Sequence, residues 1–183
     1  ELKSILEFQY FGGVNVTCQH LYPYSVAGRG RIDHPPVFGP HGNWNEGFKA
    51  FNDYFAKLSY IVTNTEENAT VGVIHPMSNI WLDYIRDEDG ESVKQTEKEF
   101  NEFLTVLRNN GIQYQFIDER ILARHGSVDG NLLKVGKCGY SAVIVPKMRN
   151  IALTTYDILR QFTGKLCMLG APEFIDGKRE KIN

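Results

Sequence analysis

The apolar positions in the second half of the chain follow two patterns, one typical of strands and one typical of helices. Short runs of β-branched or alternating apolar residues predict four strands, at 71–74, 112–117, 141–145 and 165–169. The first run stops at Pro76 and the third at Pro146, since proline lacks the N–H that a strand needs to continue its ladder.

Helical spacing fills two of the intervals between these strands. Ser92 and Gln95 match a capping box at a helix start, and Gly111 occupies the position after a helix where a left-handed residue is preferred. A second helix is predicted to begin near Thr154 or Thr155 and to end at Gly164. The order strand, helix, strand, strand, helix, strand predicts an α/β fold with a parallel, helix-covered sheet. Right-handed crossovers favour a flavodoxin-like, three-layer arrangement.

The first half of the chain has a different pattern. The run 13–18 predicts a single strand, and a loop rich in Gly, Pro, Arg and His follows at 25–42. Between Trp44 and Val62 apolar residues recur three or four apart, which predicts an amphipathic helix of about five turns. One strand and one helix cannot close a hydrophobic core. We therefore expect this half to pack on the second domain or to have lost its partner.

Polar, turn-rich residues at 63–70 predict a linker between an incomplete first part, 1–62, and a second domain, 71–183. Hydrophobic residues make up 42% of the chain and charged residues 23%, as in an ordinary globular protein. The formal net charge of −2 gives no basic face, so we expect no nucleic-acid partner. No apolar run approaches the length of a membrane helix, so we expect no membrane partner.

The loop between the predicted strand and the long helix concentrates side chains suited to ligand binding. It contains three of the five histidines together with aromatic residues: His20, Tyr22, Tyr24, His34, His41 and Trp44. Aromatic rings can stack on the C–H faces of a sugar while polar side chains bind its hydroxyls. This composition predicts a carbohydrate site, although it also fits a surface loop pinned by Tyr and Trp packing.

Three other kinds of site are disfavoured. His34 and His41 are seven residues apart, which matches no recurrent zinc pattern, so no metal is expected. Cys138 precedes a predicted strand and no histidine follows His125, which argues against a cysteine nucleophile. The turn at 75–79 contains no glycine, so no nucleotide or flavin cofactor is expected.

The carboxylates of the first half do not identify a catalytic pair. Glu7, Asp33 and Glu46 each have a simple explanation as solvated residues, and Glu46 falls in the first turn of the long helix, where it favours the helix dipole. The catalytic residues therefore stay unassigned. Cys18, Cys138 and Cys167 are far apart and form no CxxC pair, so we expect them to be small buried hydrophobic residues.

Several short motifs of the chain resemble one family of enzymes. They are Tyr10-Phe-Gly-Gly-Val-Asn15, His20-Leu-Tyr-Pro-Tyr24, Asp33-His-Pro-Pro36, Asn43-Trp44 and Tyr54-Phe-Ala-Lys-Leu-Ser59. This succession resembles the last strand, loop and helix of the (β/α)8 barrel in large bacterial glycoside hydrolases, including alpha-L-rhamnosidase-like enzymes. The run Val71-Gly-Val-Ile-His-Pro76 is similar to the start of the flavodoxin-like domain beside that barrel, a beta-galactosidase trimerisation or glutamine-amidotransferase-like module.

The resemblance implies that the chain is a fragment of a carbohydrate-active glycoside hydrolase. Residues 1–62 would contribute His20, Tyr22, Tyr24 and Trp44 to the sugar-binding rim. The second domain would serve structure or oligomerisation. The catalytic carboxylates would belong to earlier barrel strands outside this chain, so the fragment alone is expected to be inactive. Its partners would be a carbohydrate substrate, the missing barrel portion and further copies of itself, in a periplasmic or extracellular protein.

Two alternatives remain open. The chain could be a non-enzymatic, flavodoxin-like interaction or oligomerisation module, with the first half as an arm whose apolar stripe includes Phe48, Phe51, Phe55 and Leu58. It could also be a stand-alone flavodoxin-like enzyme that binds a small phosphate ligand, although the glycine-free turn argues against this.

Overall fold

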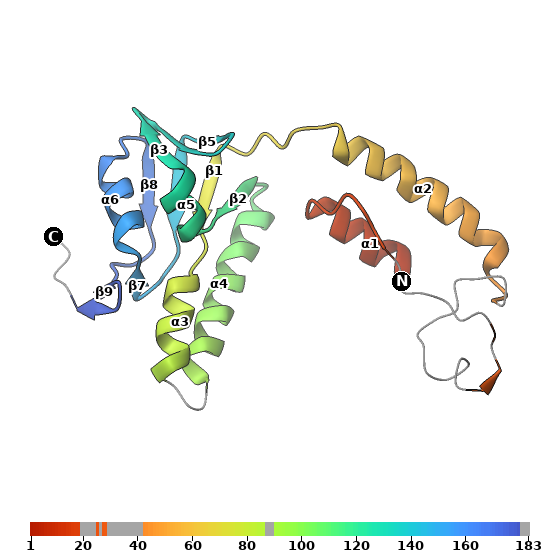
Figure 1. Cartoon of the computed structure of the whole chain (residues 1–183), viewed down its shortest axis with the longest axis horizontal. Helices are drawn as coiled ribbons and strands as arrows, with labels where there is room; N and C mark the ends of the chain where they lie inside the picture. Colours follow the sequence, from red (N-terminus) through yellow and green to blue (C-terminus); the bar gives the residue numbers. More distant parts are fainter. Residues whose placement is uncertain (19–24, 26, 29–41, 87–89, 180–183) are drawn as a thin grey trace. The chain divides into compact units, whose positions relative to one another are not determined.

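The computed structural model describes residues 1–18, 25, 27–28, 42–86 and 90–179. The chain divides into two compact units, Glu1–Glu67 and Asn68–Asn183, called unit 1 and unit 2 below (Figure 1). Among the described residues, no helix is long and apolar enough to cross a membrane.

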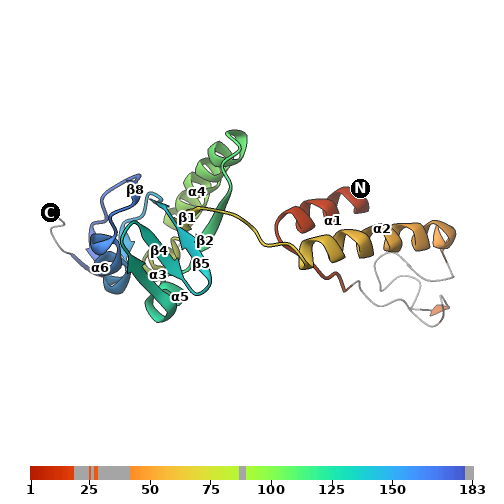
Figure 2. The same ribbon diagram turned by 90° about the horizontal axis from the view of Figure 1, so that it is seen from above.

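Unit 1 is built on two helices, α1 (Leu2–Phe11) and α2 (Asn45–Thr63), which lie side by side in Figures 1 and 2. Leu6 and Tyr10 of α1 pack on Phe55 of α2, with the Tyr10 and Phe55 ring centroids 5.5 Å apart. The predicted long helix is confirmed. Its partner is a helix that the sequence pattern did not predict.

The strand predicted at 13–18 is wrong. Helix α1 ends at a turn in which Gly13 has φ +95, and residues 14–18 then follow without regular secondary structure. A lone extended segment needs a neighbouring strand to satisfy its backbone hydrogen bonds, and the described part of unit 1 contains no strand. The feature expected to be the last strand of a barrel is therefore not formed here.

Unit 2 contains the predicted parallel sheet. It consists of β1 (Val71–Ile74), β2 (Tyr114–Ile117), β6 (Ala142–Val145) and β8 (Lys165–Met168), in the order β2-β1-β6-β8. All three neighbouring pairs are parallel. Counted among these four strands alone, the spatial order is 2-1-3-4. The direction of winding reverses between β1 and β6, which makes this position the topological switch point of the sheet.

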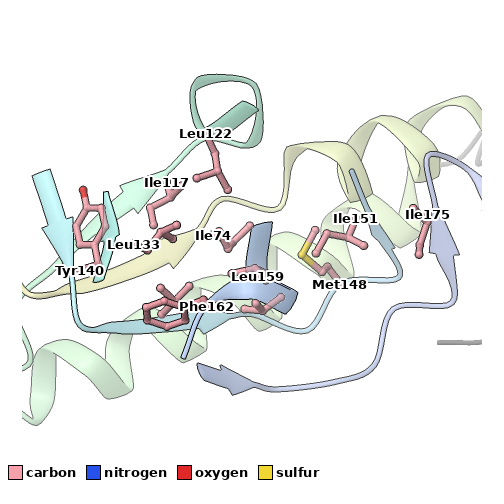
Figure 3. Close-up of a cluster of buried hydrophobic side chains, with 12 residues drawn as sticks. Ile74, Ile117, Leu122, Leu133, Tyr140, Met148, Ile151, Leu159, Phe162 and Ile175 are labelled. Atoms are coloured by element: carbon pink, nitrogen blue, oxygen red, sulfur yellow. The ribbon is translucent and has the colours of Figure 1, made fainter. Parts of the chain in front are cut away.

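Helices cover both faces of the sheet. On one face, Val73 packs with Leu104 and Leu107 of α4 (Glu91–Asn109). On the other face, the larger core joins Ile74 to side chains of α5 (Glu119–His125) and α6 (Leu153–Gln161), as Figure 3 shows for several members. The alternation of Val73 and Ile74 between these two clusters follows from the two-residue period of a strand. The α/β architecture is thus confirmed.

The two ends of α4 differ in how well the sequence predicted them. The helix begins at Glu91 after Gly90, so Ser92 lies inside the first turn and the predicted capping box is misplaced. Its predicted end is confirmed: Gly111 has φ +66, and the N–H groups of Gly111 and Ile112 donate to the carbonyls of Arg108 and Leu107. This is a Schellman motif, which needs a left-handed residue.

Several elements of unit 2 were not predicted. Helix α3 (Met77–Arg86) follows β1 directly. A three-stranded antiparallel sheet contains β3 (Gly126–Asp129), β4 (Leu132–Val135) and β5 (Cys138–Tyr140). A small mixed sheet contains β7 (Asn150–Ile151), β9 (Phe174–Ile175) and β10 (Lys178–Arg179). Leu133 and Tyr140 point from the antiparallel sheet into the main core (Figure 3).

The three cysteines are exposed, so the prediction that they are buried is wrong. Cys138 lies in β5 and Cys167 in β8, each the last strand in the order of its sheet. Cys18 lies in the irregular segment after α1. Their places at the margins of the two units leave the thiols in solvent.

Candidate functional site: a polar pocket at the carboxyl edge of the sheet

Of the residues predicted to bind a sugar, only Trp44 lies within the described part of the chain. His20, Tyr22 and Tyr24 fall outside it, as do His34 and His41. Trp44 is the residue directly before α2, its side chain is 44% exposed, and its carbonyl accepts the N–H of Phe48. The structure therefore places Trp44 at an accessible helix start and does not test the rest of the predicted rim.

A groove of about 370 Å³ runs along unit 1 between its helices and the segment after α1. It is lined by Leu6, Tyr10, Val16, Thr17, Phe48, Phe51, Asn52, Phe55, Ala56 and Ser59. Ser59 donates a hydrogen bond to the carbonyl of Asn15, which holds that segment against α2. Among the described residues that line the groove there is no His, Cys, Asp or Glu, and its polar groups are those of Tyr10, Thr17, Asn52 and Ser59.

A second hollow, of about 450 Å³, lies in unit 2 and is called the switch-point pocket below. Helix α3 follows β1, and the loop 146–149 follows β6, so residues after two adjacent parallel strands meet here. The first turns of α4 complete the lining. The described residues are Asn79, Asp83, Glu91, Ser92, Gln95, Thr96, Glu99, Lys147, Met148 and Arg149. The crevice outside the carboxyl ends of strands at a switch point is where open α/β sheets bind ligands.

Asn79 is the buried residue that joins the three walls of this pocket. Its side-chain amide donates to Asp83 Oδ2 at 3.1 Å and to Thr96 Oγ1 at 3.2 Å. Its Oδ1 accepts the backbone N–H groups of Arg149 at 2.7 Å and of Asn150 at 3.3 Å. Both amide donors and the carbonyl oxygen are thus satisfied. This one side chain fixes α3, α4 and the loop after β6 relative to one another.

Asp83 is a buried carboxylate, 4% exposed, that orients an arginine at the pocket surface. It accepts from Asn79 and from Arg149 Nη1, the latter at 3.4 Å. Arg149 Nε also donates to Glu173 at 3.3 Å, while the Arg149 side chain stays 46% exposed. A buried charge is tolerated when it is paired and hydrogen-bonded. The guanidinium is therefore held in place and still meets solvent.

A second ion pair joins α4 to the loop after β6. Lys147 Nζ lies 3.0 Å from Glu99 Oε2, and Gln95 Nε2 donates to Glu99 Oε1 at 2.7 Å. The hydrogen bond from Gln95, and after it that from Lys147, lowers the pKa of the Glu99 carboxyl below its usual 4.5. Glu99 therefore stays ionised at neutral pH and keeps its capacity to accept hydrogen bonds.

The lining of the pocket is close to neutral despite its many charges. Its three carboxylates each have a cationic partner: Asp83 has Arg149, Glu99 has Lys147, and Glu91 has Lys94 at 2.9 Å. No His or Cys lines the pocket within the described ranges, and no described group of three or more His, Cys, Asp or Glu residues is placed to hold a metal ion. The charged groups of the lining are thus held in ion pairs.

Apolar periodicity does not indicate this pocket, because its residues, Met148 apart, are polar. In α3 the inward positions are the polar residues Asn79 and Asp83, which are four apart and share one helix face. A pair of buried polar residues at this spacing, directly after a strand and a proline, is the signal that could have indicated the site. The partners of Asn79 and Asp83 after β6, Arg149 and Asn150, lie about 70 residues further along the chain, and no local pattern connects them.

No protein-family model matches the chain, and comparison with curated proteins and with solved structures also gave no match.

Proposed function

We propose that the chain is part of a carbohydrate-active glycoside hydrolase, in which residues 1–62 contribute to the rim of the sugar pocket and the α/β unit serves structure or oligomerisation. The observation that carries the proposal is the succession of motifs from Tyr10 to Ser59, in which residues 14–18 are not a strand, ahead of a 2-1-3-4 parallel sheet. That order is the flavodoxin-like one, which is the kind of module the resemblance places after the barrel. The rim residues would be His20, Tyr22, Tyr24 and Trp44.

The position of Trp44 supports a role at a rim. It immediately precedes α2, and nearly half of its indole is open to solvent. An exposed aromatic face next to polar side chains can stack on the C–H face of a sugar ring.

The geometry of unit 2 supports a structural role for the flavodoxin-like module. Cys138 lies in β5 of the antiparallel sheet, and β5 is followed by β6 rather than by a helix. An amidotransferase-type nucleophile needs a sharp strand-to-helix turn beneath it. The module in this chain therefore lacks that arrangement at Cys138, and the catalytic carboxylates would come from the barrel portion of the larger protein.

The test is hydrolysis of a panel of 4-nitrophenyl glycosides by the larger protein that carries this chain together with its barrel. We expect turnover of at least one substrate, and a fall in kcat/KM of about tenfold or more, equivalent to about 1.4 kcal/mol, in His20→Ala, Tyr22→Ala and Trp44→Ala. Trp81→Ala is the matched control, because Trp81 is similarly exposed, at 47%, but lies on α3 in unit 2. Unchanged kcat/KM in all three rim variants would contradict the assignment of these residues, and the absence of any glycosidase activity would contradict the enzyme class.

A second candidate is a non-enzymatic oligomerisation module, and the exposed apolar surface of unit 1 favours it. Phe8 and Phe11 of α1 are 73% and 90% exposed, although part of the stripe on α2 is covered by α1. Exposed aromatic side chains on neighbouring turns are typical of an interface. Sedimentation velocity of the 183-residue chain tests this candidate. We expect an oligomer whose population rises with protein concentration, and we expect the double variant Phe8→Ser, Phe11→Ser to be monomeric. A chain that is monomeric at every concentration would exclude this candidate.

A further inference from the structure

We propose that the switch-point pocket binds a neutral, polyhydroxylated small molecule, either a cyclic monosaccharide or an open-chain polyol. This site is separate from the rim residues of unit 1, and the argument for it does not depend on the hydrolase proposal.

The pocket lies at a position in the fold where parallel α/β sheets commonly bind small molecules. It lies outside the carboxyl ends of β1 and β6, where the winding of the parallel sheet reverses. Its volume of about 450 Å³ falls within the range of about 300–1,000 Å³ that is typical of small-molecule sites. The size therefore suits a small ligand and not a macromolecule.

The charge of the lining selects the ligand class. The cations Lys147 and Arg149 already pair with Glu99 and Asp83, so the pocket presents no unmatched positive field for a phosphate or carboxylate. Glu91 pairs with Lys94, which lies outside the lining, so none of the three carboxylates of the lining lacks a cationic partner that an organic cation could replace. A ligand without net charge avoids competing with these internal pairs.

The hydrogen-bonding groups of the lining favour hydroxyls. A hydroxyl both donates and accepts, and the lining places the donor Lys147 beside the acceptor oxygens of Glu99, together with the guanidinium of Arg149 that Asp83 holds. Gln95, which also lines the pocket, has an amide with both functions. No aromatic ring lines the pocket within the described residues, so a flavin or nucleobase would find no surface on which to stack.

The pocket is preorganised by its buried floor. Asn79 holds α3, α4 and the loop after β6 through four hydrogen bonds, and Asp83 holds the Arg149 guanidinium from below. A ligand would not need to order these elements when it binds, which removes part of the entropic cost of association.

The test is to titrate small-molecule probes into the ¹⁵N-labelled 183-residue chain and to monitor binding through the amide chemical shifts. The probes are D-glucose, D-galactose and L-rhamnose as cyclic sugars, sorbitol as the open-chain polyol, and inorganic phosphate as the anion. We expect saturable chemical-shift changes centred on residues 95–99 and 147–149 with at least one of the neutral probes. Binding of a sugar would identify the ligand as a cyclic monosaccharide, and binding of sorbitol would identify it as an open-chain polyol. Gln95→Ala should weaken binding by about fivefold, as expected for the loss of one hydrogen bond.

Gln161→Ala is the matched control, because Gln161 is an exposed helical glutamine with a local hydrogen bond, located on α6 and absent from the lining. Its affinity should equal that of the unmodified chain. A second variant, Arg149→Lys, keeps the positive charge but replaces the planar guanidinium, which offers several hydrogen-bond donors, by an ammonium group. This variant should also bind the ligand more weakly. Three results would overturn the proposal: no shift with any neutral probe, shifts with phosphate alone, or equal weakening by Gln95→Ala and Gln161→Ala. None of these bears on glycoside hydrolysis, so the two proposals fail separately.

Discussion

Unit 1 and unit 2 differ in how completely they bury their apolar side chains. In unit 1 the buried cluster consists of Leu6, Tyr10 and Phe55, and its remaining apolar neighbours are only partly covered. In unit 2 one cluster of twelve buried residues, drawn in Figure 3, lies on one face of the parallel sheet, and a second cluster around Val73 lies on the other. Two helices can bury only the stripe between them, whereas a sheet between helices buries both of its faces.

The difference shows where the stability of the chain resides. Hydrophobic stabilisation scales with the apolar area removed from water, about 25 cal/mol per Å². Unit 2 has the layers needed for an independent core, while α1 leaves Phe8 and Phe11 in solvent. We infer that unit 2 is the more stable unit, and that unit 1 would gain stability from any surface that covered α1.

The largest expected effect comes from emptying the better core. Leu133→Ala should lower the free energy of unfolding of unit 2 by about 3 kcal/mol, because Leu133 is fully buried and the change leaves a cavity in the main core. The matched variant Leu6→Ala should cost unit 1 less, about 2 kcal/mol, since Leu6 is buried but borders the open groove.

The two tryptophans make this comparison measurable. Trp44 lies in unit 1 and Trp81 in unit 2, so Trp44→Phe leaves a fluorophore in unit 2 and Trp81→Phe leaves one in unit 1. Urea unfolding followed by fluorescence in these two backgrounds reports each unit separately. Equal losses from Leu133→Ala and Leu6→Ala would contradict the contrast between the two cores.

A smaller effect is expected from adding one methyl group to the central sheet. A Cβ at Gly72 of β1 would lie 2.4 Å from Ile117 Cδ1 and 3.1 Å from Tyr140 Cγ, and both of these side chains are buried. Gly72→Ala should therefore destabilise unit 2 by about 1–3 kcal/mol.

Gly139→Ala is the control for this substitution, because Gly139 is also a strand glycine and its Cβ would meet no atom within 4 Å. Its change in unfolding free energy should stay within about 0.5 kcal/mol. If urea midpoints show that both variants are equally stable, the packing described around β1 is wrong.

The smallest effect concerns pH and unit 1. Tyr54 Oη donates to Glu7 Oε1 at 2.6 Å, and this bond, with further help from Lys3, lowers the pKa of Glu7 below its usual 4.5. The same bond raises the pKa of Tyr54 above 10.0. The lowered pKa of Glu7 means that its contribution to α1–α2 packing is fully present above pH 4.5 and is lost as the pH falls through the lowered value. The raised pKa of Tyr54 means that its contribution is lost as the pH rises through that value.

Tyr54→Phe removes this hydrogen bond. In an NMR titration of the side-chain carboxyl carbons, the pKa of Glu7 should rise toward 4.5, while that of Glu99 in unit 2 should stay lowered by Gln95 and Lys147. A Glu7 pKa that does not change in Tyr54→Phe would show that the contact between α1 and α2 is absent in solution. The effect on stability should be slight, since the pair lies at the surface.

The main elements of unit 2 could be predicted from the sequence because their signals are local. The strands β1, β2, β6 and β8 each contain a short apolar run, and proline or glycine marks where an element stops, as Gly111 does for α4. These signals depend on neighbouring residues only, so they can be identified without knowledge of the tertiary structure.

The sequence-based predictions that are wrong depend on tertiary packing, which local patterns do not contain. Helix α3 was missed because it buries Asn79 and Asp83 on its inner face, where the pattern requires apolar residues. The strand at 13–18 was predicted from its β-branched residues, but β propensity requires a partner strand, and the described part of unit 1 has none. Cys138 and Cys167 were expected to be buried from residue type alone, whereas their places at sheet margins expose them.

The sequence by itself determined the α/β class, the long helix α2 and the positions of the parallel strands, because hydrophobic periodicity and chain-breaking residues act within a few neighbours. Only the tertiary structure decided the order β2-β1-β6-β8, and with it the meeting of α3 with the loop after β6. The hydrogen bonds from the backbone of Arg149 to Asn79 join residues 70 positions apart, and such contacts exist only once the sheet has been assembled. The switch-point pocket is the consequence of that assembly.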